Sequence, residues 1–281
     1  MASQWTPLPG QYTITQGVIE EVQDEFDIAS FGEWTVIYDS DFTETPIIAS
    51  GEMVGLIVGS PLDIHANGRT CKLHLDGSSR SASVDLIDRI QSRLIGRYIG
   101  IIGLEEGPLL FTDAGGTLPV VYDDRGEYVA CSALSIPRVS HETHFRDDLF
   151  DVLNTATGCW IPGTTTYYRG VSQLLPNHAL DLSTWEVLRF WPTNVSDVAH
   201  TVNLESATRR IVDELERVIE TIVTNYGTPK LGITAGIDSR SLLAVSRTWA
   251  MDGRISTYTF TGEDYRQDEH VARRIAKDMD I

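Results

Sequence analysis

The chain has 281 residues, of which 40 are acidic and 22 are basic, so its formal net charge at pH 7 is −18. Apolar residues make up 42% of the sequence, which is typical of a soluble globular protein, and the length suits about two domains. So large a negative charge repels phosphate backbones and anionic membranes and disfavours nucleic-acid binding by a basic face, but a local site with a metal ion can still hold a nucleotide.

The first residues, MASQWTPLPG, lack the basic and apolar segments of a secretory signal. No apolar run approaches the ~20 residues of a membrane helix. The three cysteines, Cys71, Cys131 and Cys159, are far apart and form no CxxC pair, so we expect neither a disulfide framework nor a zinc site. They are typical of buried thiols in a reducing compartment, and we expect a cytoplasmic protein that binds no membrane.

The first half of the chain predicts strands. Short runs of β-branched and aromatic residues alternate with turns rich in Gly, Asn and Asp. Apolar residues at three- and four-residue spacing predict a helix from Val84 to Leu94, with Ser83 as its N-cap. We therefore expect a mostly antiparallel sheet domain at residues 33–135. The predicted strands cover residues 11–18, 34–38, 46–50, 53–59, 71–75, 98–104, 108–113, 120–122 and 128–132.

The second half begins with a connector and then changes its pattern. Residues 137–197 contain several Pro and Gly breaks, and we expect them to link two domains. After them, helices alternate with strands, which is typical of a parallel α/β sheet. The predicted elements are a helix at 206–225, a strand at 230–234, a helix at 239–251, a strand at 255–260 and a helix from residue 268.

Residues 231–240 have the composition of an anion-binding turn. A buried strand ends in small residues and leads directly into a helix, so free backbone N–H groups and the positive helix end point at one place. Gly236 allows a ligand to approach the backbone, and Thr234 and Ser239 supply hydroxyl groups. Asp238 would stand beside a pyrophosphate, which makes sense if it binds Mg²⁺. The structural alternative is that Asp238 merely caps the helix.

The hexapeptide TAGIDS at residues 234–239 resembles the SGGxDS pyrophosphate loop of ATP pyrophosphatases, which cleave ATP between its α and β phosphates. Other stretches resemble asparagine synthetases, in that family's order and approximate spacing. They are the hairpin segment FTDAGGTLPVVY at 111–122, the connector segments IPGTTTYYRGV, LLPNHAL and RFWP within 161–192, and the acidic segment DEHVA at 268–272. The resemblance covers residues 50–281.

This resemblance implies an α+β amino-terminal sheet domain of the N-terminal-nucleophile-hydrolase type at residues 1–136, a connector at 137–197, and the start of an α/β ATP-pyrophosphatase domain at 198–281. It implies ATP and Mg²⁺ as cofactors, with Asp238 as the metal ligand and the backbone of Phe260 as a contact to adenine. It assigns no catalytic residue. Asp268 and Glu269 are expected to be simple acids at a helix start. The residues implied to bind ATP are Leu231, Thr234, Ala235, Gly236, Asp238, Ser239 and Phe260.

Several departures change the implied activity. Glutamine-dependent members begin with a nucleophilic cysteine, whereas this chain begins with Met1, Ala2 and Ser3, so we expect no glutaminase activity, as in β-lactam synthetases and lasso-peptide cyclases. Thr112 replaces the family's Arg before the hairpin Asp, and Arg240 departs from the SGGLDSS form. The chain also stops after two strands of the parallel sheet, so we expect either a fragment or a truncated gene product, and in both cases a chain that forms no amide by itself.

For the full-length protein we expect an AMP-forming ligase of asparagine synthetase type. It would activate a small-molecule or peptide carboxylate as an acyl-adenylate, release pyrophosphate and transfer the acyl group to a nitrogen nucleophile. The sequence leaves open whether the protein assembles as a homodimer. Two alternatives also stay open: a degenerate family member that binds nucleotides without catalysis, and a glutamine-hydrolysing asparagine synthetase by homology only.

Overall fold

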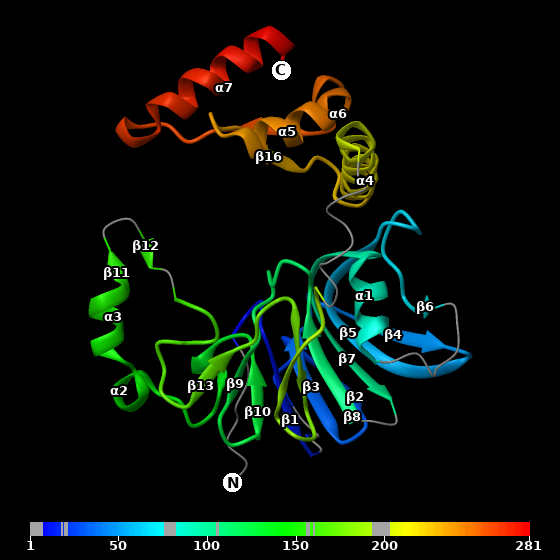
Figure 1. Ribbon diagram of the computed structural model, residues 1–281, viewed down its shortest axis with the longest axis vertical. Helices are drawn as coiled ribbons and strands as arrows, with labels where there is room; N and C mark the ends of the chain where they lie inside the picture. The colour runs from blue at the N-terminus through cyan, green and yellow to red at the C-terminus, as the bar shows by residue number, and fades with distance from the viewer. Residues whose placement is uncertain are drawn as a thin grey trace. The chain divides into compact units, whose positions relative to one another are not determined.

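The computed structural model describes residues 8–17, 19, 22–75, 83–104, 107–155, 158–159, 161–192 and 203–281. The protein is a mixed α+β protein with several sheets. It divides into two compact units (Figure 1), which are formed by residues 1–61 with 70–193 (unit 1) and by residues 62–69 with 194–281 (unit 2). No described helix combines the length and the apolar character needed to cross a bilayer.

The first sheet of unit 1 has six strands in the order β13-β9-β10-β1-β3-β2, and its neighbouring strands are antiparallel. The sequence predicted β1, β3 and the β9–β10 hairpin, but it missed β2, because Asp24, Glu25 and Asp27 conceal the apolar positions of that segment. The strands are β1 (Tyr12–Gln16), β2 (Phe26–Phe31), β3 (Trp34–Asp39), β9 (Val121–Asp123), β10 (Tyr128–Ala130) and β13 (Val171–Gln173).

The second sheet has seven strands in the order β15-β14-β8-β7-β5-β4-β6. Strand β4 pairs antiparallel with β5 and parallel with β6. The long strand β5 continues through Pro61 to Asp63, where the sequence predicted a loop. The strands are β4 (Thr43–Ala49), β5 (Glu52–Asp63), β6 (Leu73–Leu75), β7 (Leu94–Leu104), β8 (Gly107–Thr112), β14 (His178–Asp181) and β15 (Val187–Arg189).

The two sheets pack face to face around one apolar core, to which β1, β3 and β10 contribute from one sheet and β5, β7, β8 and β14 from the other. Helix α1 (Ser83–Gln91) covers the outer face of the second sheet, with Leu86, Ile87 and Ile90 buried against Ile47 and Tyr98 (Figure 1). Unit 1 is therefore a helix–sheet–sheet sandwich. Helix α1 ends before the predicted boundary, because Leu94 already begins β7.

The segment expected to be a connector, 137–197, belongs to unit 1 as far as the structure describes it. Strand β13 pairs with β9 in the first sheet, and β14 pairs with β8 in the second. The remaining elements of this part of unit 1 are η1 (Ala133–Ser135), α2 (His141–His144), α3 (Asp147–Leu153) and the ladder of β11 (Asn154–Thr155) with β12 (Gly158–Cys159).

Trp185, in the turn between β14 and β15, joins the two sheets. Its indole Nε1–H donates to the backbone oxygen of Asp123 at 2.6 Å. Its ring stacks on Trp34, with centroids 6.0 Å apart, and meets the ring of Tyr122 edge-on. One side chain from the second sheet's β14–β15 turn therefore contacts two strands of the first sheet.

Unit 2 contains the predicted alternation of helices and strands, and β16 and β17 pair in parallel. Its core includes Ile219, Ile233, Leu243 and Ile255. The helix predicted at 239–251 is divided at Ser246, whose hydroxyl donates to the backbone oxygen of Leu242 at 2.8 Å. The elements are α4 (Leu204–Asn225), β16 (Lys230–Gly232), α5 (Ile237–Val245), α6 (Arg247–Met251), β17 (Ser256–Tyr258), η2 (Glu263–Tyr265) and α7 (Arg266–Met279).

Two of the thiols expected to be buried differ in their environment. Cys131 is buried in the core of unit 1, and burial raises the pKa of its thiol to about 11. Cys71 is exposed, because it lies in a bend just before β6. The side chain of Cys159 lies outside the described residues.

We predict that Trp185→Ala lowers the free energy of unfolding of unit 1 by about 2 kcal/mol, because it removes an aromatic contact and leaves a buried carbonyl without its donor. Trp185→Phe, which keeps a ring, is expected to cost about 1 kcal/mol. Urea unfolding followed by near-ultraviolet circular dichroism measures both values. Trp191→Ala is the matched control, because Trp191 is 59% exposed. Equal effects at the two positions would contradict the role of Trp185.

We also predict that unit 1 loses stability in alkali. Burial, followed by the charges of Glu44 and Asp27, raises the pKa of Tyr38 to about 12, and burial raises the pKa values of Tyr12 and Tyr98 further. The unfolded chain releases these protons near pH 10, so stability is fully present below pH ~10 and falls as the pH rises towards ~12. Unfolding free energies measured across this window check the prediction, and Tyr38→Phe should reduce the loss. An unchanged stability would contradict it.

Candidate functional site

The parallel pairing of β16 and β17 places two chain segments at one edge of unit 2. Gly232 lies opposite Tyr258, and the N–H of Ile233 donates to the backbone oxygen of Tyr258 at 2.8 Å. Both strands end at this edge, since parallel strands run in the same direction. The turn at 233–239 and the segment at 259–265 therefore begin side by side.

The turn after β16 is held by bonds among its own polar groups. The hydroxyl groups of Thr234 and Ser239 lie 2.8 Å apart, and the N–H of Thr234 donates to the Ser239 oxygen at 3.0 Å. The N–H of Gly236 donates to the Thr234 hydroxyl oxygen at 3.1 Å. A Cβ added at Gly236 would stand 3.1 Å from that same oxygen, so glycine suits this position. The turn is therefore preorganised by Thr234 and Ser239.

Helix α5 begins at Ile237 with the N-cap Gly236, which has no side chain to bind the N–H groups of the first turn. Those N–H groups have no partner within the helix either. Asp238 is exposed in the first turn. It does not occupy the N-cap position, so the capping alternative for this residue does not describe the structure. The helix start presents N–H donors together with an exposed carboxylate.

Asp268 connects this turn to helix α7. Its Oδ1 accepts a hydrogen bond from the N–H of Ala235 at 2.7 Å. Asp268 lies in the first turn of α7, as expected for an acid at a helix start, but the sequence does not indicate its contact with a turn 33 positions away. The neighbouring Glu269 forms an ion pair with Arg273 at 2.9 Å.

This contact restricts what the turn can bind. The N–H groups of Thr234, Ala235 and Gly236 already donate to acceptors within the site. An anion would therefore use the N–H groups at the start of α5 and the hydroxyl groups, and it would approach the carboxylates of Asp238 and Asp268. A cation between the anion and these carboxylates would remove the repulsion.

Aromatic side chains gather at the end of β17. Phe260 is 59% exposed, and its ring meets that of Tyr258 edge-on, with centroids 5.9 Å apart. It also contacts the ring of Tyr265, with centroids 5.5 Å apart. The sequence indicated Phe260 alone, although the two-residue spacing of Tyr258 and Phe260 on a strand could have indicated a shared face.

The structure brings most of the predicted site residues to one edge of unit 2. Leu231 differs from the others, because its side chain packs against the core of this unit. Within the part of the chain that the structure describes, no group of three or more His, Cys, Asp or Glu side chains is placed to hold a metal ion. A metal ion here would therefore need ligands from the bound molecule as well as from Asp238.

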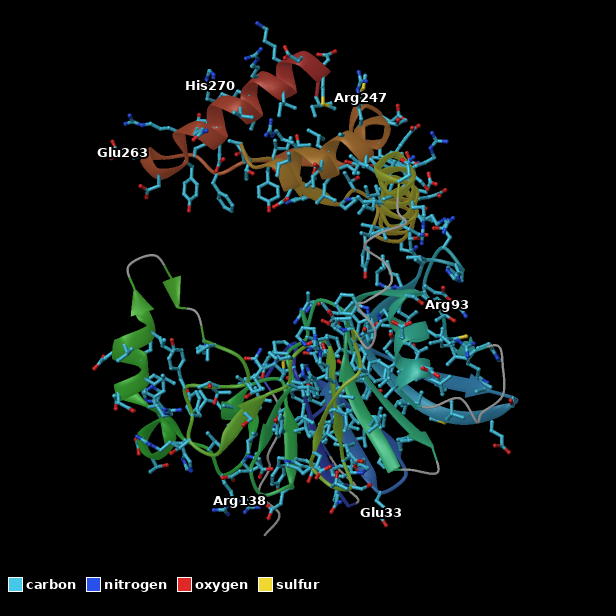
Figure 2. The ribbon with its side chains drawn as sticks, in the orientation of Figure 1. Glu33, Arg93, Arg138, Arg247, Glu263 and His270 are labelled. Carbon is cyan, nitrogen blue, oxygen red and sulfur yellow. The ribbon has the colours of Figure 1, made fainter. Side chains whose placement is uncertain are left out.

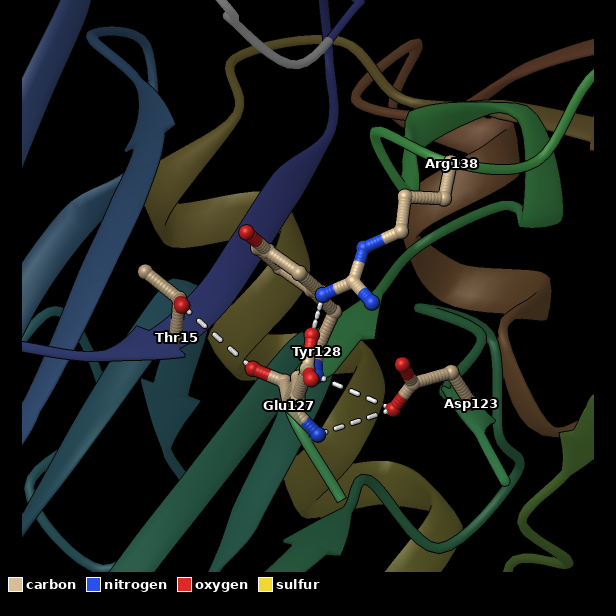
Figure 3. A network of polar contacts seen from close by, with 5 residues as sticks. All are labelled: Thr15, Asp123, Glu127, Tyr128 and Arg138. Carbon is tan, nitrogen blue, oxygen red and sulfur yellow. Dashed lines mark hydrogen bonds and ion pairs between the residues drawn. The ribbon is translucent and has the colours of Figure 1, made fainter. Parts of the chain in front are cut away.

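A charged pocket of about 250 Å³ lies in unit 1, and two of the arginines that line it already pair with carboxylates. Arg138 pairs with Glu127, whose N–H donates to Asp123 at 2.9 Å (Figure 3), and Arg169 pairs with Asp148 at 3.4 Å. The pKa of the Asp123 carboxyl is raised from its ordinary value, mainly because the group is buried. The lining includes Asp123, Asp124, Arg125, Arg138 and Arg169.

The contact between Asp268 and Ala235 gives a test of the site's architecture. Asp268→Ala removes the acceptor, so we expect the Ala235 amide to exchange its hydrogen at least about tenfold faster. Asp268→Asn keeps an acceptor oxygen and should exchange at a rate close to that of the original chain. Amide hydrogen exchange measured by NMR gives both rates. Slow exchange at Ala235 in both variants would contradict the role of Asp268 in holding the turn.

Comparison with known proteins does not assign the site. No protein-family model matches the chain, and no curated protein is detectably similar to it. The geometry of the turn and the chemistry of its side chains are therefore the basis for a functional proposal.

Proposed function

We propose that the protein is an ATP-dependent amide-forming ligase of asparagine synthetase type, with the turn at 234–239 as its pyrophosphate site. The full protein would activate a carboxylate as an acyl-adenylate, release pyrophosphate and pass the acyl group to an amine. One observation carries the proposal: a turn of small and hydroxyl residues leads from a parallel strand straight into a helix whose N-cap has no side chain.

The residues at this turn fit a pyrophosphate group. The N–H groups at the start of α5 are aimed along the helix dipole, which favours negative charge. The hydroxyl groups of Thr234 and Ser239 are held 2.8 Å apart, so each has lost freedom before a ligand arrives. The guanidinium of Arg240 donates to the Gly236 oxygen at 3.1 Å, which fixes the backbone on the other side of the turn.

The acids at the turn fit a magnesium ion that arrives with the phosphates. Mg²⁺ is usually bound by one or two carboxylates, with substrate phosphates and water as its other ligands. The exposed carboxylate of Asp238 would be one such ligand. Asp268 would contribute by orienting the turn through the Ala235 N–H. The metal would supply charge neutralisation at the departing pyrophosphate.

The neighbouring β17 edge fits the base of the nucleotide. In sheets with parallel strands, ligands bind beyond the carboxyl ends of the strands. The segment from Thr259 to Tyr265 begins at that edge, and the backbone of Phe260 would contact adenine. The Tyr258 ring lies against Gly232, whose added Cβ would stand 3.4 Å from the ring, so β16 and β17 are closely paired beneath the site.

The architecture of unit 1 supports the family part of the proposal. Two mostly antiparallel sheets packed face to face, with a helix on the outer face of one, are compatible with a domain of the N-terminal-nucleophile-hydrolase type. We propose that unit 1 is an amidotransferase-like domain and that unit 2 belongs to an ATP-pyrophosphatase domain.

We predict that Asp238→Asn weakens the binding of Mg²⁺–ATP by at least about tenfold, because it removes a metal ligand without changing the shape of the turn. Isothermal titration of the chain with Mg²⁺–ATP measures this effect. Asp213→Asn is the matched control, since Asp213 is an exposed acid in the middle of α4.

Exchange of labelled pyrophosphate into ATP, with the twenty amino acids offered together as carboxylates, then tests the reaction in the full-length gene product. The proposal predicts exchange that Asp238→Asn abolishes and Asp213→Asn preserves. Binding without exchange would favour a non-catalytic nucleotide-binding protein. Equal binding by the original chain and by both variants would contradict the assigned pyrophosphate site.

A further inference from the structure

A pocket of about 460 Å³ opens at one end of the sandwich of unit 1. Residues from five strands and two turns meet there: strands β1, β2, β3, β7 and β8, the β2–β3 turn and the turn after β14. Its size lies within the range of sites that hold small organic ligands. The lining residues are Gln16, Phe31, Gly32, Glu33, Trp34, Gly103, Pro108, Leu182 and Ser183.

The floor of this pocket is apolar and its rim is polar. Trp34 and Leu182 are buried in the core of the sandwich, and the half-buried Phe31 packs against the same core. Gln16, Glu33 and Ser183 are exposed at the mouth. An apolar floor with a few polar groups at the rim is typical of a site for a small amphipathic molecule.

The position of the Phe31 ring depends on Gly103. A Cβ added at Gly103 would stand 2.6 Å from Cε1 of Phe31 and 3.0 Å from its Cζ. The ring therefore occupies the space that any side chain at position 103 would need. The wall of the pocket is set by this close approach of an aromatic ring to the backbone of β7.

The charge of the lining selects the ligand. Glu33 is the charged residue among the lining side chains, and no Lys, Arg or His contributes to the lining that the structure describes. No described residue forms an ion pair or hydrogen bond with the Glu33 side chain. Figure 2 shows Glu33 at the lower end of unit 1, with its side chain directed away from the sandwich. An unpaired carboxylate at the mouth of a pocket with an apolar floor favours a ligand whose polar end is a cation, through Coulomb attraction.

We propose that this pocket binds a small organic cation with an apolar body, such as a primary ammonium attached to an aromatic or aliphatic group. The apolar body would enter between Phe31 and Leu182, and the ammonium would remain at the mouth beside Glu33. The pocket lies entirely within unit 1, so the inference does not depend on ATP binding by unit 2.

The test uses 2-phenylethylammonium as the probe, with 3-phenylpropanoate and 2-phenylethanol as its anionic and neutral counterparts. We expect saturable shifts of the amide signals of Gly32, Glu33 and Gly103 with a dissociation constant of about 1 mM, the order expected for a ligand of about nine heavy atoms. The alcohol should bind more weakly, and the anion should cause no saturable shift.

Two variants and one matched control complete the test. Glu33→Gln should weaken binding of the ammonium about fivefold without changing that of the alcohol. Ser183→Phe should fill the mouth and remove binding of both, while thermal unfolding shows that the sandwich is intact. Glu52→Gln, at an exposed acid of β5 outside the pocket, should change nothing. The proposal is overturned if the probe causes no saturable shift at these amides, if the anion binds as well as the ammonium, or if Glu33→Gln binds the ammonium unchanged.

Discussion

The parallel pairing of β16 with β17 is the constraint on which the candidate ATP site depends. Because Gly232 stands opposite Tyr258, the two strands end level with each other, and the turn at 234–239 starts beside the aromatic segment that follows β17. An antiparallel pairing would have placed these segments at opposite ends of the strands. The Tyr258 ring lies within ordinary van der Waals distance of position 232, so the two strand ends pack directly against each other.

Electrostatics decides which ligand this edge can accept. The helix start offers N–H groups to an anion, yet Asp238 is exposed there and Asp268 bonds to the turn itself. In a chain of net charge −18, a bare phosphate would meet repulsion at close range and from the surface as a whole. The same acids become favourable once a divalent cation accompanies the phosphates. A turn of this kind is therefore better suited to an anion that arrives with a divalent cation than to a free anion.

The sequence predicted the elements whose pattern is local. The three- and four-residue spacing of apolar residues predicted α4 almost to its ends, and the alternation after residue 203 predicted the parallel pair. It did not predict β2, because acidic residues conceal the apolar positions of that strand. It also did not predict the extension of β5 past Pro61, because proline ordinarily ends a strand. Strands β13 and β14 were also beyond local patterns, since each is only three or four residues long and pairs with a strand far away in the chain.

The candidate site likewise combines features that the local sequence indicates with features that only the folded chain brings together. The hydroxyls, the glycine and Asp238 follow one another in the sequence, so composition alone could indicate an anion-binding turn. The hydrogen bond from Ala235 to Asp268 and the meeting of Phe260 with Tyr265 depend on how β17 and α7 return to the turn. The pocket beside Glu33 joins residues from five strands and two turns, so only the folded sandwich reveals it.

The most direct measurement of the central claim is an amide chemical-shift titration of the chain with Mg²⁺–pyrophosphate, with magnesium sulfate as the reference. Binding at the proposed site predicts saturable shifts concentrated at residues 234–239, and no comparable shifts with sulfate or in the strands of unit 1. Absence of shifts in the turn, or equal shifts with sulfate, would contradict the account.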